Sequence, residues 1–167
     1  MYFGCEVNSE PALKELASLG RFLLIYALDN FSRREQLLSK AKSLITIKNA
    51  KYTLDLAKKN NIKTTISYIA GLDTIDEMKN GFEYLKDSFS SFPIINAYQT
   101  QTTEQASVLA DEAKYLNYYL KSRKEIEKIF KHVTYRPKRW ENYRPLWYRY
   151  FDDEELPNNS FGELEKI

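Results

Sequence analysis

Four short runs rich in apolar and β-branched residues recur along the chain, and a helix-length pattern separates each run from the next. The runs cover residues 2–7, 22–28, 62–70 and 94–99. The second run, FLLIYAL, is apolar throughout, which is typical of strands buried on both faces of a parallel sheet. Strands that alternate with helices in this way are joined by right-handed crossovers. The spacing therefore predicts an α/β fold with parallel strands.

Helix patterns fill the intervals between these runs. A first helix follows Asn8 and Ser9, either of which can cap it, and it ends at Gly20. The remaining helices are expected over residues 47–60, 75–87 and, as one long helix, 103–130, with a loop and a short helix within residues 31–43. Thr74 and Glu77 have the spacing of a capping box at the start of the 75–87 helix.

The turn after the third run is a candidate ligand site. Gly71 allows the backbone to turn where a side chain would clash, and Asp29 ends the preceding strand. In α/β proteins, ligands bind at the carboxyl ends of the strands, where both residues are expected. An ordinary βα turn with a capped helix, and an aspartate that only caps the next segment, are the alternative interpretations.

The composition and net charge of the chain argue against some classes of binding partner. A chain of 167 residues with 43% apolar and 29% charged residues matches one globular domain. The net charge of +2 gives no strong electrostatic argument for nucleic acid or an anionic membrane. No run approaches the ~20 apolar residues of a membrane span, and the first residues, MYFGCEVNSE, lack a secretory signal pattern. We therefore expect a cytoplasmic protein with a small-molecule substrate, no nucleic-acid partner and no membrane partner.

The chain has one cysteine, Cys5. A single cysteine forms no internal disulfide and cannot by itself hold a structural zinc ion or an iron–sulfur cluster. A buried, inert thiol is the expected state of Cys5, and no metal site is predicted.

Several segments taken together resemble the radical SAM superfamily, in particular its biotin-synthase-like branch. The resemblance covers residues 5–130 and rests on ALKELASLG, FLLIYALDNFS, ISYIAGLDT and FPIINAYQTQTTEQ. ISYIAGLDT is similar to the superfamily element G-x-I-x-G-x-x-E, which lies along the adenine of S-adenosylmethionine. Ile69 and Gly71 match that element, whereas Ser67 replaces its first glycine and Thr74 its glutamate.

This resemblance implies a fold and a set of site residues. The fold is a partial parallel (β/α) barrel, half of a TIM-like barrel, over residues 1–132, with a long C-terminal helix. Ile69 and Gly71 would lie against the adenine of S-adenosylmethionine, Asp29 would contact the ribose or the substrate, and Glu6 and Asn8 would line the same cavity as substrate-binding residues. Catalytic residues are not assigned.

The family's cysteine triplet, C-x3-C-x2-C, is absent from the sequence. In the family these thiolates hold a 4Fe–4S cluster, and cleavage of the sulfonium requires it. We therefore expect this chain to be the carboxyl-terminal portion of such an enzyme, with the cluster bound by a part outside it. The alternative is a non-catalytic α/β half-barrel interaction module that has lost the cofactor.

An aromatic and basic strap with a polar tail is expected over residues 133–167. Tryptophan, tyrosine and phenylalanine alternate with arginine and lysine in YRPKRWENYRPLWYRYF. Such a pattern can stack on bases of single strands, but the acidic run DDEE follows at once and would repel a phosphate backbone. We expect the rings to pack on the barrel or over its mouth. A barrel cut before its third strand also leaves an unpaired edge on the strand of residues 2–7, which predicts a partner chain or self-association.

Overall fold

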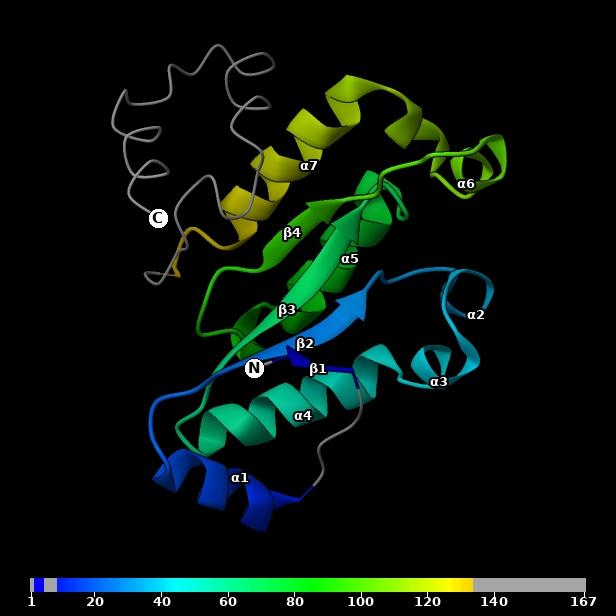
Figure 1. Ribbon diagram of the computed structural model, residues 1–167. Helices are drawn as coiled ribbons and strands as arrows, with labels where there is room; N and C mark the ends of the chain where they lie inside the picture. The colour runs from blue at the N-terminus through cyan, green and yellow to red at the C-terminus, as the bar shows by residue number, and fades with distance from the viewer. Residues whose placement is uncertain (1, 5–8, 134–167) are drawn as a thin grey trace, which may run out of the picture.

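The computed structural model describes residues 2–4 and 9–133 and contains one parallel sheet (Figure 1). Its four strands are β1 (Tyr2–Phe3), β2 (Leu23–Asp29), β3 (Lys63–Ala70) and β4 (Ile94–Ala97), in the spatial order β1-β2-β3-β4. Each strand pairs in parallel with the strand that follows it in the chain. The predicted α/β fold with parallel strands is therefore confirmed. Within the described residues the sheet is open and does not close into a barrel.

In the described part of the chain, four helices of nine residues or more accompany the sheet: α1 (Glu10–Ser18), α4 (Ile47–Lys59), α5 (Ile75–Leu85) and α7 (Leu116–Ile129). Shorter elements are α2 (Arg34–Leu37), α3 (Lys40–Ser43), α6 (Thr103–Ser107) and the 3₁₀ helices η1 (Lys86–Ser88) and η2 (Asp111–Lys114). No helix in the described part of the chain is both long enough and apolar enough to cross a membrane.

Side-chain caps start the helices where the sequence indicates. The Ser9 hydroxyl accepts the Ala12 N–H at 3.3 Å, and the Thr46 hydroxyl accepts the Asn49 N–H at 3.1 Å. The predicted capping box of α5 is confirmed, because Thr74 accepts the Glu77 N–H at 3.3 Å while the Glu77 carboxylate accepts the Thr74 N–H at 2.8 Å. These bonds satisfy N–H groups that have no helical acceptor.

The prediction of one long helix from residue 103 to 130 is wrong. The segment forms α6, η2 and α7, and Tyr115 before α7 has an extended backbone with φ −115° and ψ 139°. The chain bends here because the N–H of Ala110 donates to the Gly71 carbonyl at 2.9 Å. A tertiary contact with the loop after β3 thus overrides local helix propensity.

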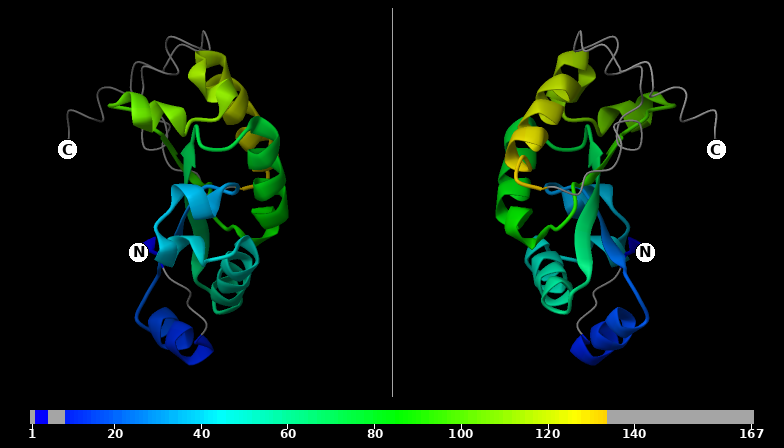
Figure 2. Two further views of the ribbon diagram at one scale, coloured as in Figure 1. Left: turned by 90° about the vertical axis from the view of Figure 1, so that its right-hand side faces the viewer. Right: turned by 90° about the vertical axis from the view of Figure 1, so that its left-hand side faces the viewer.

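The helices α4 and α5 lie on the same side of β2 and β3, as both edge-on views show (Figure 2). α1 packs on α4, and α7 packs on α5. The strand residues that face these helices are fully buried and belong to the main core: Leu24, Tyr26, Leu28, Ile66 and Tyr68. Burial of such large side chains is the main contribution to the stability of the fold.

The opposite sheet face carries smaller and more polar residues. Ile25 aligns with Thr65, Ala27 aligns with Ser67, and Ser67 in turn aligns with Ile94. Ile69 aligns with Asn96. Ala27, Ile69 and Ile94 are half-buried, and Asn96 is exposed. None of these residues belongs to the main core described above. We call this surface the second sheet face.

Candidate functional site at the carboxyl ends of β2 and β3

Asp73 joins the loop after β3 to the loop after β2. Its side chain is fully buried. One carboxylate oxygen, Oδ2, accepts the Phe31 N–H at 2.9 Å, and Oδ1 accepts both the N–H of Ser32 at 2.8 Å and its hydroxyl at 2.7 Å. Buried carboxylates persist only with such partners. Asp73 therefore fixes the path of the chain after β2.

Two arginines follow on the same loop. Arg33 has a left-handed backbone, with φ 47°, and its guanidinium donates to the Leu72 carbonyl and to the Val108 carbonyl, the latter at 3.2 Å. Arg34 donates to the Leu28 carbonyl at 2.7 Å and to the Lys42 carbonyl at 3.1 Å. Burial lowers the pKa of Arg34, against the opposing effect of the nearby Asp29 charge. The arginines thus tie the loops after β2, β3 and β4 together.

Tyr118, on α7, closes the turn after β3. Its hydroxyl accepts the Gly71 N–H at 3.1 Å and donates to the Asp73 carbonyl at 2.7 Å. Gly71 has φ 114°, and a Cβ placed on it would lie 3.2 Å from both Leu109 Cδ2 and the Tyr119 hydroxyl. Glycine is needed here both for its backbone conformation and for the close approach of these side chains.

Tyr68 lies beneath this turn and is fully buried. Burial, together with the charge of Asp73, raises the pKa of Tyr68 well above its usual value. Within the described residues its hydroxyl has no hydrogen-bond partner. Burial also raises the pKa of Tyr118. Both phenols are therefore neutral at physiological pH, and only the Tyr118 hydroxyl has hydrogen-bond partners among the described residues.

The structure places three of the predicted site residues at this edge. Asp29, with φ 70°, forms an ion pair with Lys42 and aligns with Tyr68 across a bulge in the β2–β3 pairing. Ile69 lies half-buried on the second sheet face. Gly71 has its N–H and its carbonyl bonded to Tyr118 and Ala110. Glu6, Asn8 and Cys5 lie outside the described residues, as do the predicted strap and tail of residues 133–167 apart from the first residue.

Sequence reasoning missed the residues that hold these loops together. Asp73 adjoins the predicted Gly71 turn, so its position gave a partial signal, but nothing indicated that Phe31 and Ser32 are its partners. Tyr118 was one of several tyrosines on a predicted helix, with no local pattern to distinguish it. Contacts across about 40 residues depend on the three-dimensional path of the chain and leave no periodic signature.

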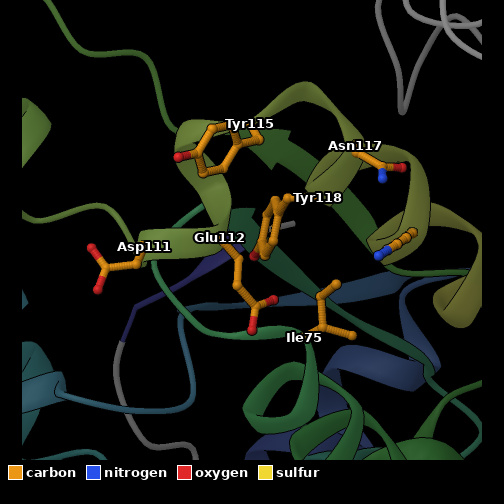
Figure 3. A pocket seen from close by; sticks show the side chains of 7 residues that line it. Ile75, Asp111, Glu112, Tyr115, Asn117 and Tyr118 are labelled. Atoms are coloured by element: carbon orange, nitrogen blue, oxygen red, sulfur yellow. The ribbon is translucent and has the colours of Figure 1, made fainter.

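Two open pockets flank the site. One, of about 460 Å³, lies between the start of α5, η2 and α7 (Figure 3). The other, of about 450 Å³, lies beside the loop after β2 and is lined by residues that include Phe31, Arg33, Arg34, Thr46 and Ile47. Both volumes fall within the range of small-molecule sites.

The donor set of the chain does not fit an iron–sulfur cluster. The sequence has a single cysteine and a single histidine. Among the described residues, no three histidine, cysteine, aspartate or glutamate side chains are grouped so that they could hold a metal ion. Clusters of this type need several thiolates. Ile69, by contrast, offers an apolar, half-buried surface that a planar ring can contact.

Comparison with known proteins does not assign the chain to a family. No protein-family model matches the sequence, and no curated protein matches it either.

Proposed function

We propose that this chain is the carboxyl-terminal portion of a radical SAM enzyme of the biotin-synthase-like branch. In this proposal the enzyme performs 5′-deoxyadenosyl-radical chemistry on a small organic substrate. The chain is not competent alone, because the cysteines that bind the cluster belong to another part of the enzyme. S-Adenosylmethionine is the cofactor that this resemblance implies.

The main observation in support of the proposal is that the strands lie in chain order with their helices on one side of the sheet. The four parallel strands follow one another in chain order, and α4 and α5 lie on one side of them. A (β/α) barrel has this arrangement, with helices outside and the other face turned inward. A doubly wound sheet instead reverses its strand order and carries helices on both faces. The arrangement supports a half TIM-like barrel.

The second sheet face supports the same proposal. It carries the small or polar side chains of Ala27, Thr65, Ser67 and Asn96 beside three isoleucines, Ile25, Ile69 and Ile94. Thr65 donates to the Phe92 carbonyl at 3.0 Å and is therefore already satisfied. Small residues on the inward face of a barrel leave volume for a ligand. In this role Ile69 contacts the adenine, and Asp29 lies at the carboxyl edge with Lys42.

The role that we propose for Gly71 differs from the role that the resemblance implies. Both of its backbone polar groups are bonded within the chain, and side chains enclose its Cα. We propose that Gly71 shapes the turn beside the cofactor, and that Ile69 makes the contact. The donors of this chain do not fit the cluster, so in this proposal the part of the enzyme that carries the cysteines holds it.

One observation favours the alternative, a non-catalytic half-barrel interaction module. Asp73 and Arg33 bond the loops after β2 and β3 to each other. The polar groups in these bonds are therefore occupied within the chain, whereas a ligand-binding loop would leave such groups available to its ligand. Cofactor binding discriminates between the two functions.

The first experiment is to sequence the DNA upstream of the Met1 codon for a cysteine triplet. The full chain, expressed with that upstream segment or with a separately encoded partner that carries the triplet, is then titrated with S-adenosylmethionine. We expect binding that Ile69→Glu weakens about tenfold or more, and that the exposed-site control Leu44→Glu leaves unchanged. Absence of binding in the complete assembly would favour the interaction module.

A further inference from the structure

The pocket between the start of α5, η2 and α7 brings side chains of opposite charge around two tyrosines. Its lining comprises Ile75, Asp111, Glu112, Tyr115, Asn117, Tyr118 and Lys121. On α7, Lys121 lies four positions after Asn117 and three after Tyr118, so it shares one side of the helix with both of them. The pocket is thus built from a helix face, the short η2 turn and the first residue of α5.

The two acidic residues of η2 have different environments. Asp111 forms an ion pair with Lys114, with 2.6 Å between the carboxylate and the ammonium. In Figure 3 the Asp111 side chain points away, whereas Glu112 extends toward Ile75 beneath the Tyr118 ring. Within the described residues no hydrogen bond or ion pair engages the side chain of Glu112 or of Lys121, although the Glu112 carbonyl accepts the Tyr115 N–H at 3.2 Å. The pocket therefore holds one carboxylate and one ammonium that are both available to a ligand.

The apolar part of the pocket is fixed more firmly than its charged part. Tyr118 is 2% exposed, and its hydroxyl is held by Gly71 and Asp73. Its ring and Ile75 therefore form a stable wall. Tyr115 is 71% exposed and lies on the opposite side of the pocket. An aromatic ring that is exposed beside a pocket gains most when a ligand covers it.

We infer that this pocket binds a small zwitterion, an α-amino acid with an apolar or aromatic side chain. Glu112 pairs with the ammonium of the ligand, Lys121 pairs with its carboxylate, and the two tyrosines contact its side chain. A ligand with only one charge would leave the other protein charge without a partner. This inference does not depend on the proposed radical SAM function, because the pocket lies on the helix side of the sheet and uses neither Ile69 nor Asp29.

The test compares three ligands that share a phenyl ring: L-phenylalanine, 2-phenylethylamine and 3-phenylpropanoate. Isothermal titration of the full chain should give binding of L-phenylalanine about tenfold tighter than of either singly charged compound. Glu112→Gln should remove the advantage over 3-phenylpropanoate, and Lys121→Met should remove the advantage over 2-phenylethylamine. Glu104→Gln and Lys48→Met, at exposed positions that do not line the pocket, are matched controls that should leave all three affinities unchanged.

All four positions are exposed, so the variants should fold like the parent, and thermal unfolding checks this. Binding of L-phenylalanine no tighter than that of the singly charged compounds would overturn the inference. Equal affinity of the parent, Glu112→Gln and Lys121→Met chains would overturn it as well. Because S-adenosylmethionine is not used in this experiment, neither result bears on the proposed function, which is tested separately by S-adenosylmethionine binding.

Discussion

The carboxylate of Asp73 receives two hydrogen bonds from Ser32, one from the backbone N–H at 2.8 Å and one from the hydroxyl at 2.7 Å. The two residues belong to loops that follow neighbouring parallel strands. A buried charge of this kind is stable only while its donors stay in place. Because of the Asp73–Ser32 pair, each of these loops keeps its conformation only while the other loop is in place.

Asp73→Asn should destabilise the fold. The amide loses the charge that strengthens these bonds, and its NH₂ group would face a donor from Ser32 or Phe31. We expect a loss of about 2–3 kcal/mol in the free energy of unfolding, measured by urea denaturation. Asp55→Asn is the control, because Asp55 is in an exposed ion pair with Lys51 and should cost less than about 0.5 kcal/mol. Equal losses for both variants would contradict the role given to Asp73.

Gly81→Ala should destabilise α5, although alanine is the better helix former. A Cβ on Gly81 would overlap the Phe31 ring, which also contacts Tyr68 and Phe82 at centroid distances of 5.3 and 5.0 Å. Helix propensity gains about 1 kcal/mol, whereas overpacking costs about 1–3 kcal/mol. We expect a net loss by denaturation. Asn80→Ala, at the exposed neighbouring position, should be neutral or stabilising. A stabilised Gly81→Ala chain would show that Phe31 does not occupy this place.

Stability should fall at alkaline pH, with Tyr68 as one cause. The pKa of Tyr68 is raised in the folded chain, chiefly by burial. The unfolded chain therefore releases this proton first, near pH 10, and the folded chain retains it. Stability is unaffected by Tyr68 below pH 10 and decreases above it by up to about 1.4 kcal/mol per pH unit.

Tyr68→Phe should reduce this slope, as measured by urea denaturation between pH 8 and about 11, the range that spans the phenol's usual pKa. Tyr52→Phe is the control, because Tyr52 is 55% exposed. Identical slopes in the parent and in Tyr68→Phe would contradict the buried, neutral state of this phenol.

The sheet edges should promote association. β1 and β4 each pair with one neighbour only among the described strands, and unpaired edges provide a template for another chain. We expect the apparent mass in sedimentation velocity to rise with protein concentration. A monomer that unfolds cooperatively and stays monomeric at every concentration would count against the half-barrel proposal.

Local chemistry made much of the fold predictable. The apolar run of β2 and the capping box of Thr74 and Glu77 are written in consecutive residues, so strand and helix positions could be read directly. The break before α7 could not be predicted from the sequence, because it depends on the Ala110–Gly71 hydrogen bond. The Gly71 turn was found from its glycine, whereas the buried hydroxyl of Tyr118 has no sequence signal.

Phe31 and Arg33 occupy adjacent parts of one short loop yet act in different places. Phe31 inserts its ring against Gly81 on the helix side of the sheet, while Arg33 reaches the carbonyls of Leu72 and Val108. Substitutions at these positions are therefore coupled across the molecule. In diverging copies of this gene, a larger residue at position 81 should appear together with a smaller one at position 31. Inserting residues into this loop should be tolerated poorly, so a reporter or tag is better placed elsewhere.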